Sequence, residues 1–309
     1  MKILVTGGAG FIGSHIVDAY LSFGHEVVII DNLSTGSVEN INPKAKFINM
    51  DINDTRLNVI FYEEKFDLVN HQAAQIDVRI SVGNPRYDAE VNILGALNLY
   101  ESALANGVKK IIFASSGGAI YGDQDYFPAD EEHPLRPCSP YGIAKLVNEK
   151  YLDYYRMVHG IHFVALRYGN VYGPRQSYRG EAGVIAIFIN KILDGEEPVI
   201  NGDGKNTRDY VCVHDVVKAS VIATDPTCKG IFNIGTGIET DVNQIFSSLK
   251  NLLKSDIPEI HGPAKQGEQR RSVISYSRIN KNHGWMPDYN LNDGLRLTVD
   301  YFRQKHNSK

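Results

Sequence analysis

The chain has 309 residues, of which 43% are apolar and 22% are charged, and its formal net charge is −4. These fractions are close to the averages of soluble globular proteins, which excludes disordered and fibrous architectures. The slightly acidic balance gives no basic field to hold a polyanion, so we expect no nucleic-acid partner. At roughly 100 to 200 residues per domain, the length allows one large domain or two smaller ones.

The cysteines and the N-terminal segment indicate in which cellular compartment the protein is expected. Cys138, Cys212 and Cys228 are an odd number without a C-x-x-C pair, which argues against a disulfide framework or a zinc site, so we expect no metal. Glycines at Gly7 and Gly8 break the first apolar run before a signal-peptide core could form. No stretch reaches the roughly 18 apolar residues of a membrane helix. We therefore expect a cytoplasmic protein without a membrane partner.

Short β-branched runs recur along the chain, and each is followed by a segment with helical spacing. This alternation is typical of a parallel sheet with crossover helices. Several runs are apolar throughout, as strands buried on both faces should be. We expect an α/β fold, namely a doubly wound parallel (Rossmann) sheet with a smaller α/β domain. The predicted strands are 2–5, 26–30, 46–50, 67–71, 109–113 and 162–167.

The alternation is interrupted after about residue 169 by segments rich in glycine, proline and charged residues. Pieces with strand and helix spacing return later, so the second domain is expected to be discontinuous. We predict the sheet domain at 1–168 plus about 209–238. The second domain is predicted at about 169–208 plus 239–309.

The first predicted strand runs directly into a glycine-rich turn at 6–13. Gly7 permits a tight turn, Gly10 lets a pyrophosphate approach the backbone, and Gly13 lets the helix pack closely on the strand. A bare turn is the alternative. However, a strand precedes the turn, an apolar helix follows it, and the second strand ends in Asp31, so the pattern predicts dinucleotide binding.

Asp31 lies where a carboxylate can accept hydrogen bonds from the ribose hydroxyls of adenosine. Its charge repels a 2′-phosphate, and no arginine or lysine stands beside it, so we predict NAD rather than NADP. The alternative is that Asp31 caps a turn with Asn32. The ends of the third and fourth strands also lie where a doubly wound sheet presents its ligand. The predicted cofactor-binding residues are Gly7, Gly10, Phe11, Ile12, Gly13, Asp31, Asn32, Asp51, Ile52, Ala73, Ala74, Asn92, Tyr141 and Lys145.

A tyrosine and a lysine follow the small residues that end the fifth strand, at 115–122. Ser139 suits an N-cap and Pro140 a first helical turn, so Tyr141 and Lys145 lie one turn apart on one helix face. An ammonium beside a phenol stabilises the phenolate. With a nicotinamide nearby, this lowers the tyrosine pKa from about 10 toward neutrality. The pair predicts a general base, and an incidental pair on a helix surface is the alternative.

The order and spacing of these motifs resemble the extended short-chain dehydrogenase/reductase superfamily, and within it the UDP-glucose (UDP-galactose) 4-epimerase family. The resemblance covers nearly the whole chain. The motifs that carry it are T-G-G-A-G-F-I-G at 6–13, D-N-L at 31–33, S-S-G-G-A-I-Y-G at 115–122, S-P-Y-G-I-A-K at 139–145, R-Y-G-N-V-Y-G-P-R at 167–175, R-D-Y-V at 208–211 and G-E-Q-R-R-S at 267–272.

The resemblance implies an isomerase, an NAD-dependent UDP-sugar 4-epimerase that interconverts UDP-glucose and UDP-galactose. Hydride transfer at C4 to bound NAD is reversible in this family, so the cofactor is regenerated in each cycle. The sheet domain is then the NAD-binding domain and the second domain binds the nucleotide sugar. The helices after the fourth and fifth strands form a dimer interface in this superfamily, so we also expect a homodimer.

The resemblance assigns the catalytic roles. Tyr141 takes the proton of the sugar 4-hydroxyl, Lys145 contacts the nicotinamide ribose, and Ser116 hydrogen-bonds the same hydroxyl. Ser115 is the alternative serine.

The nucleotide sugar is expected to meet residues from both domains. Arg208 and Arg270 match the family's phosphate-binding arginines, and guanidinium can grip phosphate bidentately. Arg271 competes with Arg270 for that role, and Asn170 matches the family's asparagine. The predicted substrate-binding residues are Arg79, Ser81, Ser116, Tyr141, Asn170, Arg208, Arg270 and Ser272.

Two positions bear on the reaction and the sugar. Ser272 falls where relatives limited to non-acetylated sugars carry a bulky tyrosine, so we expect N-acetylated hexosamines to be accepted as well. The strand tip has Gly-Gly-Ala where dehydrating relatives place an acid, which disfavours elimination. The alternatives are a UDP-uronate 4-epimerase, another NAD-dependent nucleotide-sugar modifying enzyme, or an NAD-binding sensor without catalysis. Loss of Tyr141 or Lys145 would mark the sensor, and both are present.

Overall fold

The computed structural model describes residues 1–178, 183–264 and 269–308. The chain divides into two compact units. Unit 1 consists of Met1–Ile120, Pro137–Arg167 and Val217–Phe232, and unit 2 consists of Tyr121–Arg136, Tyr168–Val216 and Asn233–Lys309. Within the described ranges, none of the helices combines the length and the apolar character that crossing a bilayer requires.

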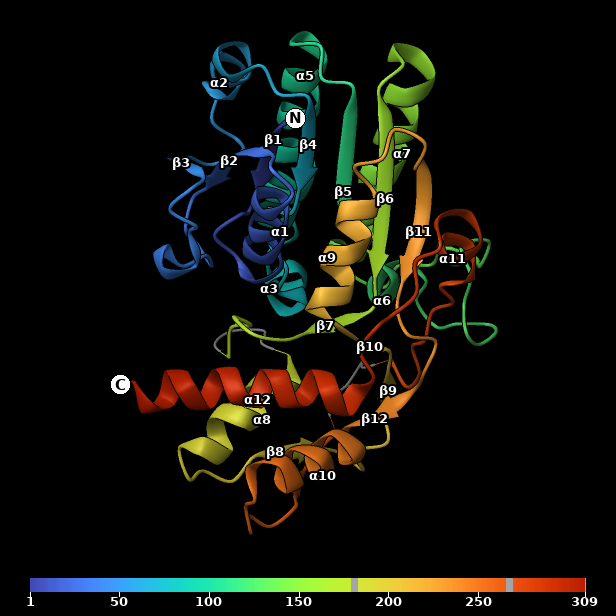
Figure 1. The fold of residues 1–309 in the computed structure, drawn as a ribbon. Coiled ribbons are helices and arrows are strands. Elements are labelled where there is room, and N and C mark those ends of the chain that lie inside the picture. Colours follow the sequence, from blue (N-terminus) through green and yellow to red (C-terminus); the bar gives the residue numbers. More distant parts are fainter. Residues whose placement is uncertain (179–182, 265–268, 309) are drawn as a thin grey trace. The chain divides into compact units, whose positions relative to one another are not determined.

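A seven-stranded sheet in the order β11-β6-β5-β4-β1-β2-β3 carries unit 1 (Figure 1). The pairs β1–β2, β1–β4, β2–β3 and β4–β5 are all parallel, which confirms the doubly wound fold. The strand order reverses at β1 and β4, and in such sheets ligands bind beyond the carboxyl ends of the strands at this point. The strands are β1 (Lys2–Thr6), β2 (Glu26–Asp31), β3 (Lys46–Asn49), β4 (Leu68–His71), β5 (Lys110–Ser116), β6 (His162–Tyr168) and β11 (Gly230–Ile234).

The six predicted strands are all present, with ends that differ by at most three residues. The largest difference is at β5, which continues to Ser116 and therefore includes both serines of the predicted strand tip. The strands are apolar because both faces are covered. Ile3, Leu4 and Val5 of β1, for example, have no exposed surface.

Helices of unit 1 pack on the sheet and contribute to one apolar cluster with it. Between α4 and α5, the element η2 is a short π-helical segment that carries Asn92. The helical elements are α1 (Phe11–Ser22), η1 (Val38–Asn40), α2 (Leu57–Glu64), α3 (Val78–Gly83), α4 (Pro85–Ala89), η2 (Glu90–Leu94), α5 (Gly95–Ala105), α6 (Gly117–Ile120), α7 (Pro140–His159) and α9 (Val213–Ile222), the last of which begins in unit 2.

Unit 2 has its own core, in which α8, α10 and α12 pack together. Its short strands form the parallel pairs β7–β10 and β8–β13 and the antiparallel pair β9–β12. Leu295, Val299 and Phe302 place the apolar face of α12 in this core. The elements are β7 (Asn170–Tyr172), α8 (Val184–Leu193), β8 (Val199–Asn201), β9 (Thr207–Arg208), β10 (Tyr210–Cys212), β12 (Thr240–Asp241), α10 (Val242–Leu253), β13 (Ile260–Gly262), α11 (Ser277–His283) and α12 (Leu291–Asn307).

The unit boundaries differ from the predicted domain boundaries in three segments and at residue 168. Residues 121–136, 168, 209–216 and 233–238 belong to unit 2, although all were predicted in the sheet domain. Ala129 pairs with the 273–275 segment through Ala129 N to Val273 O at 3.0 Å, and β10 pairs with β7. These pairings join residues far apart in the sequence, so no local pattern predicts them. The assignment of one binding role to each domain stays a prediction.

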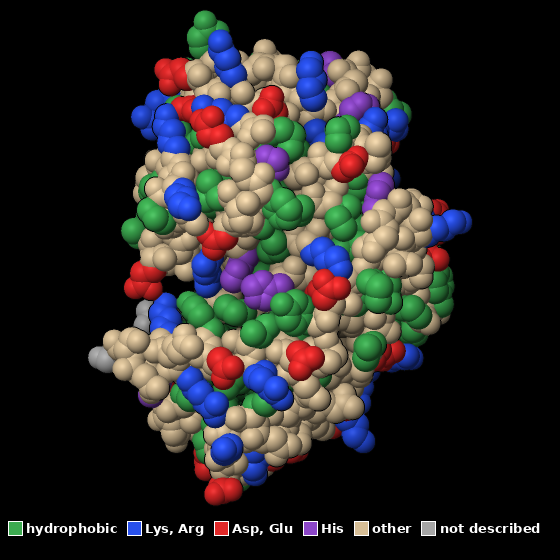
Figure 2. Space-filling view, viewed as in Figure 1, with side chains coloured by type: hydrophobic (Ala, Val, Ile, Leu, Met, Phe, Trp, Pro, Cys, Tyr) green, Lys and Arg blue, Asp and Glu red, His purple; other side chains and the backbone are tan. Residues whose placement is uncertain are grey.

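Charged side chains of both signs are interspersed on the face shown in Figure 2. No large area of that face carries a single sign, as expected for a formal net charge of −4.

Candidate active site

The turn between β1 and α1 requires glycine at two of the predicted positions. Gly7 has a φ of +69°, a left-handed conformation that side chains disfavour, and an added Cβ would lie 2.7 Å from Ala73 N. A Cβ on Gly13 would lie 2.1 Å from Gly7 O. The first turn of α1 therefore packs directly on the end of β1.

Helix α1 begins at Phe11 without a side-chain cap. Gly10 is the N-cap residue, and no side chain accepts a hydrogen bond from the first turn. The first N–H groups of a helix have no intrahelical partner and bind anions well. Beside a closely apposed glycine turn, the backbone N–H groups of Phe11 and Ile12 fit the pyrophosphate of a dinucleotide.

Asp31 ends β2 and is 8% exposed. Its Oδ2 accepts from Ala9 N at 3.0 Å and its Oδ1 from Leu33 N at 2.8 Å. The bond from Leu33 N caps the turn that contains Asn32, which was the alternative role for Asp31. Together with the bond from Ala9 N, it also fixes the orientation of the carboxylate. Each carboxylate oxygen has further acceptor capacity, so the same group can still bind ribose hydroxyls. Next to it, Asn32 Nδ2 donates to Asp51 Oδ2 at 2.6 Å.

The loop after β4 is held by neighbouring elements. Ala73 N donates to Thr6 Oγ1 at 3.3 Å. Asn92 accepts from Gln75 N at 2.9 Å and donates to Gln75 O at 2.8 Å. The side chain of Asn92 is therefore used to shape the loop, and Ala74 lies within the loop so shaped. Ile52 is 5% exposed and is buried among apolar residues.

Helix α7 carries Tyr141 and Lys145 and begins as predicted. Pro140 is its first residue, and Ser139 Oγ accepts from Gly142 N at 3.1 Å. Lys145 Nζ donates to Ala114 O at 2.8 Å and lies 5.5 Å from the centroid of the Tyr141 ring. The ammonium is thus fixed by β5 close to the phenol.

Burial sets the titration of the lysine. Lys145 is 4% exposed, and desolvation lowers its pKa to about 8, while the charge of Asp88 acts in the opposite direction. A cation this near the tyrosine stabilises a phenolate electrostatically. The pair has the geometry of a general base with its electrostatic support.

The structure separates the two serines of the strand tip. Ser115 is 2% exposed, and its hydroxyl donates to Glu149 Oε1 at 2.6 Å. Glu149 is held in turn by Arg167, through Nε to Oε1 at 2.9 Å and Nη2 to Oε2 at 2.7 Å. Because the Ser115 hydroxyl is used internally, the half-buried Ser116 at the end of β5 is the serine better placed to meet a ligand.

Glu149 and Arg167 were not singled out from the sequence. The usable signal is spacing, since Glu149 lies two turns after Tyr141 and one turn after Lys145 on α7. Its partners lie on β5 and β6, so the carboxylate joins α7 to the strand tip.

Arg79 and Ser81 lie on α3 with their polar groups engaged. Arg79 Nη2 is 2.8 Å from Asp77 Oδ2, in a pair whose arginine is largely exposed. Ser81 has no exposed surface and donates from Oγ to Val78 O at 2.8 Å. This placement does not favour a ligand contact for Ser81.

In unit 2, the two predicted phosphate-binding arginines lie on neighbouring segments. Thr207 N donates to Arg270 O at 3.0 Å, which places β9 beside residue 270. Arg208 Nη1 donates to Gln269 O at 2.8 Å. Arg270 forms a bidentate ion pair with Asp203 at 2.8 and 2.9 Å. That pair is about half exposed, so it adds little stability and can be exchanged for a phosphate.

A residue that the sequence analysis did not single out organises this part of unit 2. Asp209 is buried and accepts from Thr236 N at 2.7 Å, Gly237 N at 3.0 Å and Ile274 N at 3.3 Å. Its own carbonyl accepts from Asn170 N at 2.7 Å. Burial raises the pKa of Asp209 above its usual value, and the hydrogen bonds from the Thr236 hydroxyl and the three N–H groups offset part of that shift. Asp209 thereby fixes the backbone around Asn170.

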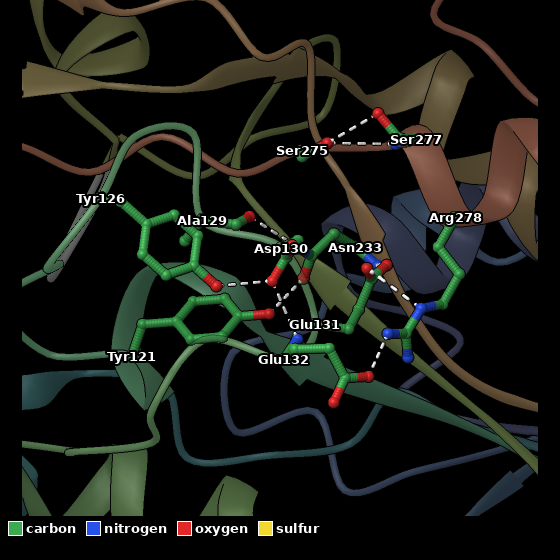
Figure 3. A network of polar contacts seen from close by, with 10 residues as sticks. All are labelled: Tyr121, Tyr126, Ala129, Asp130, Glu131, Glu132, Asn233, Ser275, Ser277 and Arg278. Atoms are coloured by element: carbon green, nitrogen blue, oxygen red, sulfur yellow. Dashed lines mark hydrogen bonds and ion pairs between the residues drawn. The ribbon is translucent and has the colours of Figure 1, made fainter.

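Segment 121–136 is anchored within unit 2 by the network shown in Figure 3. Tyr121 Oη donates to Asn233 Oδ1 at 2.7 Å, and Asn233 Nδ2 donates to Ala129 O at 3.1 Å. Asn233 N donates to Glu131 Oε1 at 2.7 Å, and Arg278 pairs with Glu131 at 3.3 Å. The segment is therefore tied to β11 and to α11.

The same segment contacts the residues on both sides of Ser272. The guanidinium of Arg271 lies 3.7 Å from the centroid of the Phe127 ring, and Val273 N donates to Gln124 Oε1 at 3.1 Å. Ser272 itself is 3% exposed. Two residues of the motif at 267–272, Gly267 and Glu268, lie outside the described residues.

Arg271, the predicted competitor of Arg270, is paired with Glu239 through Nε at 3.1 Å and Nη2 at 2.5 Å. In the described part of the chain, no group of three or more His, Cys, Asp or Glu side chains has the arrangement of a metal site.

Comparisons with known proteins place this geometry among enzymes. The model of the "NAD dependent epimerase/dehydratase family" matches residues 3–235. A protein of Mycolicibacterium smegmatis named UDP-glucose 4-epimerase is 43% identical over 312 residues, which cover 99% of both chains.

Two solved structures are similar over nearly the whole chain. The UDP-glucose 4-epimerase of Thermotoga maritima, solved with UDP-glucose, is 48% identical, covers 99% of both chains and has a TM-score of 0.96. The UDP-N-acetylglucosamine 4-epimerase of Methanobrevibacter ruminantium, solved with UDP-N-acetylmuramic acid, is 37% identical, covers 98% of both chains and has a TM-score of 0.93.

Proposed function

The chain belongs to the NAD dependent epimerase/dehydratase family, and on that premise we propose that it is a UDP-sugar 4-epimerase. Its reaction is the interconversion of UDP-glucose and UDP-galactose, and the N-acetylated pair is a second substrate pair. The observation that carries the proposal is the buried Lys145, fixed 5.5 Å from the Tyr141 ring at the start of α7.

The residues at the switch point of the sheet suit NAD. The N–H groups at the start of α1 bind its pyrophosphate, and the oriented carboxylate of Asp31 binds the adenosine ribose. When bound, NAD supplies the oxidation and the later reduction of the sugar carbon that bears the 4-hydroxyl.

Tyr141 transfers the proton, and Lys145 stabilises the phenolate. The Tyr141 phenolate accepts the proton of the 4-hydroxyl and returns it when the hydroxyl is restored. The Lys145 ammonium stabilises the phenolate, and two of its three donors remain for a ribose after the bond to Ala114 O. Ser116 donates a hydrogen bond to the same sugar oxygen.

The proposal assigns the remaining substrate contacts to the residues that the sequence predicted. Arg208 and Arg270 bind the diphosphate, and Asn170 binds the nucleotide sugar. The small side chain at Ser272, where relatives limited to non-acetylated sugars carry a tyrosine, is the basis for the N-acetylated pair. The relative from Methanobrevibacter ruminantium, which is named for an N-acetylated sugar, supports this extension.

The test uses purified protein without added cofactor, incubated with UDP-galactose and, separately, with UDP-N-acetylgalactosamine. We expect both 4-epimers to form, as followed by NMR, because the cofactor stays bound and is regenerated. Tyr141→Phe should lower kcat by roughly 100- to 10,000-fold, the usual contribution of a general base.

Two outcomes would change the proposal. No conversion of either sugar nucleotide by folded protein, even with added NAD, would reject it. Conversion of UDP-galactose alone would remove the N-acetylated pair and with it the role given to Ser272.

The proposal includes a homodimer. A mostly apolar concave area on α7 is lined by Leu146, Val147, Lys150, Tyr151 and Tyr154, and such a surface suits a second copy of the chain. The cytoplasmic location stays a prediction from the sequence.

A further inference from the structure

Two opposite charges are buried in unit 1 on elements that pack against each other. Asp88 of α4 is 1% exposed and Lys145 of α7 is 4% exposed. α4 and α7 pack together, and so do η2 and α7. Removing an isolated charge from water is costly, so a buried carboxylate that only amides contact requires an explanation.

The hydrogen bonds of Asp88 are to neutral groups. Its Oδ1 accepts from Gln75 Nε2 at 3.0 Å and from Asn92 Nδ2 at 3.0 Å. Lys145 Nζ likewise donates to a neutral carbonyl, Ala114 O, at 2.8 Å. Each charge is therefore hydrogen-bonded, but neither is neutralised by these bonds.

A chain of contacts connects the two groups. Asn148 lies three residues after Lys145 on α7, and its Nδ2 donates to Asn92 O at 2.7 Å. The side chain of Asn92 donates in turn to Asp88. The face of α7 that carries Lys145 is thus held against the segment that holds Asp88.

We propose that Asp88 is a positioning residue for the proposed epimerase reaction, and that its buried carboxylate is the counter-charge that keeps the Lys145 ammonium protonated. The proposal rests on the catalytic role given to Lys145. The mutual influence of the two charges supports it. Burial lowers the pKa of Lys145, and the charge of Asp88 opposes that shift. Burial raises the pKa of Asp88, and its amide hydrogen bonds and the charge of Lys145 oppose that shift.

Other ionisable groups on the elements around Lys145 are engaged or neutral. His71 of β4 is fully buried, and burial lowers its pKa to about 3, so it is uncharged at neutral pH. Asp77 and Arg79 at α3 pair with each other. Two further charged groups, Arg86 of α4 and Glu90 of η2, are exposed, so water screens them.

On α7 itself, Tyr141 is the group beside Lys145, and Glu149 is paired with Arg167. On β5, Lys110 donates to Asp225 O at 2.5 Å. Among the described groups on these elements, Asp88 is thus the buried carboxylate that forms no ion pair, and it is the one to be tested.

The experiment measures the titration of Lys145 directly, by ¹³C NMR of the lysine side chains. Lys145→Met identifies the signal, and Asp88→Asn removes the charge while keeping an oxygen for both amide donors. We expect Lys145 to titrate roughly one pH unit lower in Asp88→Asn than in the unchanged protein. The readout does not depend on catalysis, so it is separable from the test of the epimerase activity.

Asp215→Asn is the matched control. Asp215 is also fully buried, but it lies in unit 2 and accepts from Asp288 N at 2.8 Å. This control should leave the titration of Lys145 unchanged. Equal titration of Lys145 in the unchanged protein and in Asp88→Asn would overturn the proposal, whatever the effect of the substitution on stability.

If Asp88→Asn does not fold, the double variant Asp88→Asn with Lys145→Met distinguishes a counter-charge role of Asp88 from a purely structural one. Under the proposal the two substitutions are coupled, because the first leaves a buried cation without its counter-charge and the second removes that cation. The double variant should then fold. A double variant that is also unfolded would show a purely structural need for the carboxylate and would reject the proposal.

Discussion

Burial of the Lys145 ammonium destabilises the folded chain. Its amine is almost fully buried, and its pKa of about 8 lies below the value of 10.5 for a free lysine. The same burial that destabilises the folded chain brings the pKa of the amine closer to neutral pH.

This cost predicts a pH dependence of stability. Between about pH 8 and pH 10.5 the unfolded chain holds a proton that folded Lys145 has lost, so the free energy of unfolding rises with pH in that window. Below pH 8 both states are protonated and the full cost is present. Relative to Lys145→Met, we expect the unchanged protein to gain at most about 3 kcal/mol across the window.

Urea unfolding of the two proteins without cofactor, at pH values from 7 to 10.5, measures this difference. Curves that stay parallel over the whole window would contradict the burial cost. The subtraction removes the titration of the other buried groups, because both proteins share them.

Residues differ in how well the sequence predicts them. Tyr141 and Lys145 are predictable because a cap, a proline and the i, i+4 spacing place them locally. Asp88, Glu149 and Asp209 are not, since their partners lie on other elements and become neighbours only in the folded chain.

At the scale of elements, the contact of β1 with α1 determines the cofactor turn. The strand, the glycines and the helix were all predictable, because each follows from a local pattern. The close approach of Gly13 to Gly7 O is seen only in the folded chain, but the glycine spacing already predicted it.

Gly13→Ala should impair both folding and cofactor retention. Its Cβ would meet Gly7 O at 2.1 Å, so the helix must move away from the strand. We expect a loss of roughly 1–3 kcal/mol in the free energy of unfolding and loss of co-purifying NAD. Thermal unfolding and the nucleotide content of the purified protein measure the two effects.

Gly83→Ala is the control for that substitution. Gly83 is the last residue of α3, and an added Cβ has no atom within 4 Å. We expect a change of less than about 1 kcal/mol and full NAD content. Equal effects of both substitutions on stability and NAD content would show that the close contact between Gly13 and Gly7 is not the cause of the losses.

Segment 121–136 shows where element-level prediction fails. In the sequence it lies between α6 and α7, which favours the sheet domain, yet it pairs through Ala129 with residues 273–275. The pairing partner is more than 140 residues away along the chain, and no turn or periodic pattern indicates it.

At the scale of the whole molecule, the open question is assembly. The exposed side of α7 carries Tyr151, Tyr154, Met157 and Val158, which are between 37% and 65% exposed. An apolar stripe on a helix that already packs on the sheet with its other face is typical of an interface between protein chains.

We therefore expect the protein to be a dimer, and Tyr154→Asp to dissociate it. A buried unpaired charge at an interface is strongly unfavourable, so the dissociation constant should rise by roughly 100-fold or more. Analytical ultracentrifugation over a concentration series measures the change. Tyr62→Asp is the control, because Tyr62 is 72% exposed on α2 and outside the stripe. A monomeric unchanged protein, or a dimer unaffected by Tyr154→Asp, would contradict the assignment of this face.

The central claim is that one site oxidises and reduces the same sugar carbon. The most direct test supplies UDP-galactose with deuterium at C4 to the purified protein in ordinary water and analyses the UDP-glucose formed by NMR and mass spectrometry. The account predicts that the deuterium stays at C4 of the product, because the hydrogen removed from C4 is returned to the same carbon. Product that has exchanged its C4 deuterium for solvent hydrogen would contradict it.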